Sequence, residues 1–245
     1  MCGRYTLTVP VAQLALRFGA DAAPVAADLA PRYNIAPSQA NPVVINQDGA
    51  ALALMQWGLI PAWSREPSSR YSTINARIET VAEKPAFRGP LRNRRCLVPA
   101  TGYYEWQARP GAPARAPKQP YFITLGHDGG PGKVFAFAGL YDIWRGPDGQ
   151  ELATYTILTT AANDLLRPLH ERMPVILPRE AEAQWLDPAI SDPARLLALL
   201  QPSREDRISA YPVSSAVNSP AFDSPDLLVP VPGLAAMQWQ APELC

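Results

Sequence analysis

The chain begins Met1-Cys2-Gly3-Arg4, which places a thiol directly behind the initiator methionine. Cysteine is small enough for that methionine to be clipped, and the product carries an α-amine and a thiol on neighbouring carbons. Such a terminus has two uses. The thiolate can attack an acyl carbon with the amine as base, or the amine can condense with an aldehyde before the sulfur closes a five-membered thiazolidine ring. Ordinary pKa values predict that both groups are partly nucleophilic near neutral pH without large tuning. Alternatively, the cysteine is inert.

Three later stretches hold side chains suited to hydrogen bonding or proton transfer. In INARIET (74–80), Asn75 and Arg77 share one side of an extended chain, or else the asparagine caps a helix. In GYYEW (102–106), Glu105 either faces solvent through strand alternation or is desolvated, with a raised pKa that suits acid–base work. In LHERMPVIL (169–177), His170 precedes a strand, and a lone histidine is usually a surface or packing residue.

Composition and charge exclude several classes of protein. The 245 residues are 47% hydrophobic and carry 22 basic and 22 acidic side chains, so no overall basic field indicates a nucleic-acid partner. Three cysteines without a close pair favour a reducing compartment over a disulfide framework. No apolar run is long enough for a membrane span, and we expect a cytoplasmic protein. With two histidines, no Cys-x-x-Cys and no glycine-rich phosphate loop, we expect neither a metal nor a cofactor.

The hydropathy pattern predicts many short strands with few helices. We expect strands at 2–9, 96–106, 121–125, 134–140 and 152–160, with a hairpin from 42–46 to 51–57. Helices are predicted at 11–18, 179–186 and 193–200, and 107–120 forms a Pro-rich loop. No linker separates two composition regimes. The prediction is therefore one α+β domain (1–245) around a strongly curved, barrel-like mixed or antiparallel sheet with peripheral helices, ending in a tail from about residue 219.

An ordered series of motifs resembles one known family. The series includes MCGRY at the start, YNIAPSQ (33–39), MQWGLIPAW (55–63), INARIET, KPAFR (84–88), RRCLVPATGYYEW (94–106), LHERMPVIL and PVSSAVNSP (212–220). In this order and number they resemble the SOS response-associated peptidase (SRAP) family, whose members covalently capture abasic sites in single-stranded DNA. The Pro-rich loop and the C-terminal tail fall outside the resemblance.

The resemblance implies a role for each of four catalytic residues. Cys2 is the crosslinking nucleophile, whose amine forms the Schiff base with the ring-opened deoxyribose and whose sulfur completes the thiazolidine. Asn75 holds that terminus by hydrogen bonding. Glu105 orients the amine and moves protons, and His170 assists opening of the sugar.

The resemblance also implies a DNA interface and a setting. Arg4, Arg77 and Arg172 are expected to grip phosphates, and Trp63 to stack on a neighbouring base. Some relatives have a second tryptophan where this chain has Ser64. The expected partner is single-stranded DNA with abasic sites. The protein is expected to be a monomer and to be associated with the nucleoid only when it is bound to DNA.

Three alternatives compete with this interpretation. Class II glutamine amidotransferases also begin Met-Cys-Gly, but their following apolar run and His-Arg-Gly stretch are missing here. A protease could use Cys2, Glu105 and His170, and its substrate could be the chain's own first peptide bond. A non-catalytic single-strand binding module would use the arginines and tryptophans alone.

Overall fold

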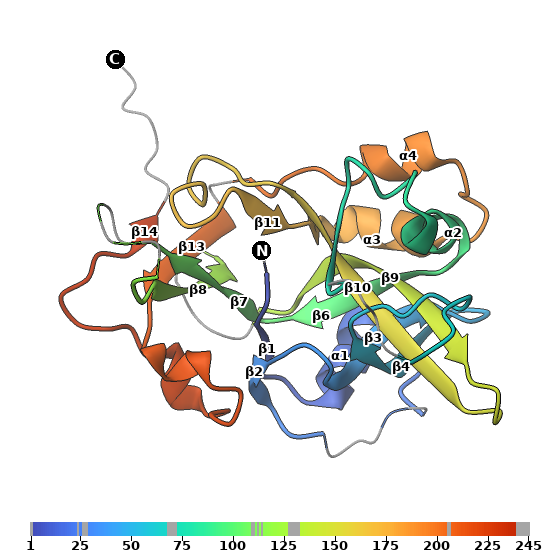
Figure 1. Ribbon diagram of the computed structural model, residues 1–245, viewed down its shortest axis with the longest axis horizontal. Coiled ribbons are helices and arrows are strands. Elements are labelled where there is room, and N and C mark those ends of the chain that lie inside the picture. The colour runs from blue at the N-terminus through green and yellow to red at the C-terminus, as the bar shows by residue number, and fades with distance from the viewer. Residues whose placement is uncertain are drawn as a thin grey trace.

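The computed structural model describes most of the chain, and its strands form two sheets with helices around them (Figure 1). The residues it describes are 2–23, 25, 29–67, 73–108, 111, 113, 115–126, 133–204 and 207–238. The α+β class with a barrel-like sheet and peripheral helices, predicted from the sequence, is confirmed.

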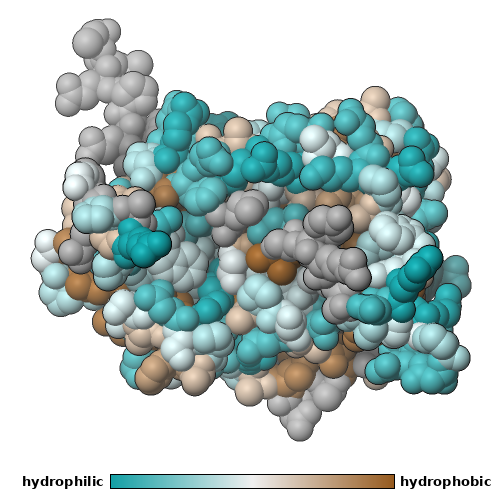
Figure 2. All heavy atoms as spheres, viewed as in Figure 1, coloured by the Kyte–Doolittle hydropathy of each residue, from teal (hydrophilic) through white to brown (hydrophobic). Residues whose placement is uncertain are grey.

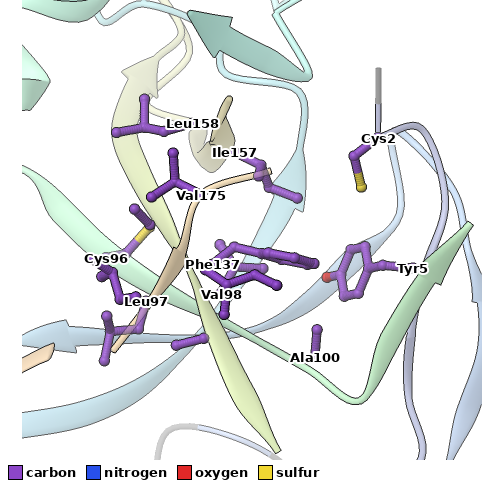
Figure 3. Packing of buried hydrophobic residues seen from close by; sticks show 14 of the residues in the cluster. Cys2, Tyr5, Cys96, Leu97, Val98, Ala100, Phe137, Ile157, Leu158 and Val175 are labelled. Carbon is purple, nitrogen blue, oxygen red and sulfur yellow. The ribbon is translucent and has the colours of Figure 1, made fainter. Parts of the chain in front are cut away.

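Five strands of the larger sheet close into a barrel. They pair in a ring in which every neighbour is antiparallel except β10 with β4, which run parallel. Apolar runs form these strands, which is typical of strands buried on both faces, and Figure 3 shows Val98, Phe137 and Ile157 packed together on one of those faces. The barrel strands are β3 (Ala40–Asn46), β4 (Ala50–Trp57), β6 (Arg95–Ala100), β9 (Phe135–Arg145) and β10 (Glu151–Ala161).

Strand β10 continues beyond the barrel and gains a short partner on each edge. β5 (Asn75–Arg77) runs parallel to it and places Asn75 opposite Ile157. β11 (Arg172–Pro174) runs antiparallel and places Arg172 opposite Ala161. β12 (Ile176–Leu177) pairs with β9. One end of β10 therefore holds two strands that carry predicted site residues.

The second sheet has six antiparallel strands, and at Thr101 the chain passes into it directly from the barrel. The chain leaves β6 in the barrel and enters β7 of this sheet directly after Thr101, whose hydroxyl lies 2.9 Å from that of Thr6. The strands, in spatial order, are β14 (Met237–Gln238), β13 (Ile208–Pro212), β8 (Gln119–Leu125), β7 (Gly102–Gln107), β1 (Tyr5–Leu7) and β2 (Arg32–Ile35).

Short helices surround the sheets, and α2, α3 and α4 gather at one side of the barrel (Figure 1). No helix in the described part of the chain is long and apolar enough to cross a membrane. The face seen in Figure 2 is mainly hydrophilic, with small hydrophobic spots. The helices are α1 (Val11–Phe18), α2 (Pro85–Asn93), α3 (Arg179–Leu186) and α4 (Pro193–Ala198), with 3-10 turns η2 (Ser215–Asn218) and η3 (Pro225–Leu228).

Several predicted elements differ from the observed ones. The helices at 11–18 and 179–186 and the hairpin are confirmed, whereas the last helix ends at Ala198. The strand predicted at 2–9 is limited to Tyr5–Leu7, and the one at 96–106 is divided between two sheets at Thr101. Helix α2 was not predicted. It contains Pro90, which usually ends a helix, but Phe87 and Leu91 bury its inner face.

Candidate active site

Cys2 lies at the edge of the core, immediately before β1, with no exposed surface. Its sulfur points toward the ring of Tyr5 (Figure 3) and lies 3.8 Å from the carbonyl oxygen of Arg4. Burial raises the pKa of the Cys2 thiol well above its ordinary value, and the charge of Glu105 raises it further. In this conformation burial therefore disfavours the thiolate, an effect that ordinary pKa values do not include. Met1 lies outside the described residues.

Asn75 contacts the backbone of Cys2 directly. Its Nδ2 donates a hydrogen bond to the carbonyl oxygen of Cys2 at 2.7 Å. Its Oδ1 is buried and has no hydrogen-bond partner among the residues that the structure describes. INARIET contributes a strand rather than a capped helix, so the extended alternative holds, and Arg77 follows two positions on.

Strand β7 places Glu105 beside Cys2. The backbone N–H of Tyr104 donates to the carbonyl oxygen of Arg4 at 3.0 Å, and the same oxygen is the near neighbour of the Cys2 sulfur. The Cys2 sulfur is therefore close to the backbone of β7 at Tyr104. Because side chains alternate along a strand, Tyr103 and Glu105 lie on the same face of β7. Glu105 is 4% exposed, and burial raises the pKa of its carboxyl. The desolvated alternative for this carboxylate is confirmed.

His170 lies in the turn before β11. Its Nδ1 accepts the backbone N–H of Arg172 at 3.0 Å, so the neutral ring carries its proton on Nε2. Burial lowers the pKa of this imidazole, which favours the neutral form. Gln107, at the end of β7, donates to the Pro168 carbonyl oxygen at 3.5 Å and links this turn to the strand that carries Glu105.

Two of the three arginines expected to grip DNA bind other parts of the protein. Arg4 donates to the Asn34 side chain at 2.8 Å and to the Val217 carbonyl oxygen at 2.6 Å. Arg172 forms a two-pronged ion pair with Glu79, at 2.6 and 2.9 Å.

Arg77 and Trp63 remain accessible. Arg77 is exposed and makes no ion pair or side-chain hydrogen bond with any residue in the described ranges. Trp63 is 68% exposed, on the segment between β4 and β5. That segment is closed at its base by the hydrogen bond from Leu59 N–H to the Thr73 carbonyl oxygen at 3.3 Å.

Sequence reasoning missed residues that shape this site. Asp223 accepts from the Arg32 side chain and from the backbone N–H groups of Tyr33 and Asn34, which fixes β2 beside Arg4. No local signal marks Asp223, because its partners lie about 190 positions away. Glu79, in contrast, stands within INARIET, and its charge opposite to that of Arg172 was a usable signal.

Comparisons with known proteins agree on one family. A family model described as SOS response associated peptidase (SRAP) matches residues 1–220. The abasic site processing protein YoqW of Bacillus subtilis is 44% identical over 230 residues, covering 93% of this chain and 99% of its own length. The abasic site processing protein HMCES of Gallus gallus is 36% identical, covering 82% of this chain and 66% of that protein. A crystal structure of a Bacteroides thetaiotaomicron protein matches with a TM-score of 0.81 and 31% identity, over 94% of this chain and all of the other.

Proposed function

The chain belongs to the SRAP family, and from that premise we propose that it captures abasic sites in single-stranded DNA covalently, through Cys2 freed of Met1. Relatives that match over most of the chain are named abasic site processing proteins. The adduct would shield the lesion during replication-associated repair.

The proposed reaction needs two nucleophiles on adjacent carbons. The freed amine of Cys2 adds to the aldehyde carbon of the ring-opened sugar, and loss of water leaves a C=N bond. The thiol then adds across that bond: the sulfur bonds to carbon, and the thiol proton is transferred to nitrogen. The product is a five-membered thiazolidine. An internal cysteine cannot follow this route, because its nitrogen is held in an amide.

The observation that carries the proposal is the contact of Asn75 with Cys2. The Asn75 side chain holds the Cys2 carbonyl through Nδ2 and leaves a buried Oδ1 without a partner among the described residues. A buried acceptor without a donor is costly, and the amine released by loss of Met1 is a donor at the same residue. Asn75 would thus hold both the carbonyl group and the freed amine of Cys2.

Glu105 and His170 would supply proton transfer. A desolvated carboxyl with a raised pKa can take a proton from the attacking amine and return it to the departing hydroxyl. The Nε2–H of a neutral His170 can donate to the ring oxygen as the sugar opens.

Arg77 and Trp63 are the DNA contacts best supported by their exposure, as a phosphate ligand and a stacking platform. Arg4 and Arg172 could bind phosphate only after breaking the hydrogen bonds that they make within the protein. Their first role would therefore be to hold the elements around the site in place.

A gel assay tests the proposal. Protein whose intact mass shows loss of Met1 is incubated with single-stranded DNA that carries one abasic site. We expect a heat-stable shifted band that is absent with undamaged DNA. The band should be lost in Cys2→Ala and retained in Cys96→Ala, the same change at a second buried cysteine.

A blocked terminus provides the decisive variant. A bulky residue inserted between Met1 and Cys2 prevents clipping and turns the amine into an amide, so capture should disappear. A complex that dissociates on heating, or full capture by the blocked protein, would overturn the proposal.

Autocatalytic removal of Met1 is a second candidate activity. The observation in its favour is that the charge of Glu105 reaches the Cys2 thiol, as a base for that thiol must. Protein translated in a purified system without methionine aminopeptidase should then lose Met1 in the wild type and keep it in Glu105→Gln. Retention of Met1 in the wild type would exclude this activity.

A further inference from the structure

The hydroxyl of Tyr103 is fully buried and has no hydrogen-bond partner among the residues that the structure describes. Other buried tyrosines differ. The hydroxyls of Tyr5 and Tyr155 bind each other at 2.7 Å, and Tyr104 donates to the Tyr33 carbonyl oxygen at 2.8 Å. A buried hydroxyl that is left unpaired is costly and calls for an explanation.

The position of Tyr103 points to the reacting atoms. It shares one face of β7 with Glu105, and the Cys2 sulfur lies along the backbone between them, at Tyr104. The Tyr103 ring packs edge-on against Phe137, with centroids 5.8 Å apart. Negative charge on Cys2 or on Glu105 raises the pKa of Tyr103, on top of the larger effect of burial. Tyr103 therefore remains a protonated donor within electrostatic reach of both groups.

We propose that Tyr103 is a further catalytic group, whose hydroxyl donates a hydrogen bond to the Cys2 sulfur while that sulfur loses its proton and closes the ring. The inference rests on the proposed function and concerns only its second step. The sulfur–carbon bond forms as the C=N electrons move to nitrogen, and the thiol proton passes to that nitrogen by way of Glu105. Tyr103 keeps its own proton throughout.

The need for such a donor follows from the burial of Cys2. A thiolate in an apolar pocket lacks solvent, and Glu105 disfavours it further. Of the polar groups around Cys2, Glu105 and Tyr103 come from β7 and Tyr5 from β1, and each interacts electrostatically with the thiol. The uncharged Asn75 of β5 binds the Cys2 carbonyl oxygen rather than the sulfur. Tyr5 already shares its hydroxyl with Tyr155, which leaves Tyr103 as the donor that has no partner within the described part of the chain.

The test separates the two steps of capture in Tyr103→Phe. Borohydride added at successive times traps the imine, and heat stability without reductant reports the closed ring. We expect imine formation at the wild-type rate. Ring closure should be about 10-fold slower at neutral pH, with its pH profile moved to higher pH, because loss of the donor makes the thiol harder to ionise.

Tyr104→Phe is the matched control, since it removes a hydroxyl from the opposite face of the same strand. It should lose the bond to Tyr33 and lower the melting temperature with ring closure unchanged. Tyr103→Phe, which loses no bond in the resting protein, should melt at or above the wild-type temperature.

Two results would overturn the inference: an unchanged rate and pH profile of closure in Tyr103→Phe, or equal slowing of both steps in Tyr103→Phe and Tyr104→Phe. Failure of the wild type to form any imine or adduct would instead overturn the proposed function.

Discussion

Glu105 is an acid in a strand of aromatic residues, where only 4% of it remains exposed. Burial raises its pKa, so the folded protein holds this proton to higher pH than the unfolded chain does. Its contribution to stability is therefore fully present below the pKa of the unfolded chain, about 4.3. The contribution is lost as pH rises through the higher pKa of the folded protein.

Glu105→Gln should consequently gain stability relative to the wild type as pH rises from about 4 to neutrality. The same variant should form adduct about 100-fold more slowly, because it lacks the acid–base group. Denaturant titrations of both proteins at several pH values, with adduct rates at neutral pH, check this. A stability difference that stays constant with pH would contradict the buried carboxyl, and an unchanged rate would remove it from the mechanism.

His170 should titrate below its ordinary value of about 6.5. A lowered pKa means that the folded state binds this proton less readily than the unfolded chain does. The stability that His170 contributes is therefore present above pH 6.5 and is lost as pH falls through the lower pKa of the folded protein. NMR of the imidazole nitrogens measures the midpoint and the tautomer, and His127→Gln leaves one histidine to assign. A midpoint above 6.5 would contradict the effect of burial on the imidazole, and a proton on Nδ1 would contradict the hydrogen bond from the Arg172 N–H.

Residue types singled out Cys2 and Glu105 as candidate groups, because a terminal cysteine and a carboxylate among aromatics each restrict the chemistry locally. The contact of Asn75 with Cys2 agrees with the role implied by the family resemblance. The partners of Arg4 were not predictable, since the Val217 carbonyl lies 213 positions away. Nor does any local pattern show that the Tyr103 hydroxyl lacks a partner, which depends on packing around it.

At the scale of elements, the passage from β6 to β7 depends on a glycine. A Cβ on Gly102 would lie 2.1 Å from the Phe122 ring and 3.0 Å from the Ile123 carbonyl oxygen. At Gly102, β7 and β8 therefore lie closer together than a residue with a Cβ would allow. The strand that carries Tyr103 and Glu105 starts at this glycine.

Gly102→Ala should reduce the free energy of unfolding by about 1–3 kcal/mol, because either the ring or the strand must move. Gly89→Ala in α2 is the matched control. Its Cβ would meet only the Arg94 guanidinium, at 4.0 Å, and the change should stabilise by about 0.5–1 kcal/mol. Denaturant unfolding of both variants measures the effects. Equal effects at the two positions would show that the close approach at Gly102 does not restrict the chain.

The elements that sequence predicted well are those with a clear local pattern. Helices α1 and α3 follow a proline and repeat apolar residues on one face. The division of 96–106 at Thr101 has no local signature, because both halves are buried and only pairing with distant strands separates the sheets. Barrel closure itself rests on the parallel pair of β4 with β10, which composition does not reveal.

Across the whole molecule, equal numbers of acidic and basic residues leave no general attraction for DNA. Encounter would then depend on a few phosphate contacts, and among Arg4, Arg77 and Arg172 the exposed side chain is that of Arg77. The logarithm of the capture rate should fall with the logarithm of salt with a slope of about −0.7 for each phosphate bound. Arg77→Gln should reduce that slope by about 0.7, measured by timed quenching at several salt concentrations. The finished adduct, being covalent, should resist salt, and a capture rate that ignores salt would contradict the model.

The enclosure of Cys2 also sets an order of events on the ribosome. Asn75, β7 and β10 emerge long after Cys2, and the barrel cannot close before β10, which begins at Glu151. At about 5–20 residues per second, the first residues wait roughly 7–30 s before their neighbours exist. On the proposed function, an aminopeptidase that removes Met1 within that interval acts on a chain in which Cys2 is not yet enclosed. Removal by the chain itself, which needs Glu105 on β7, would instead have to follow folding.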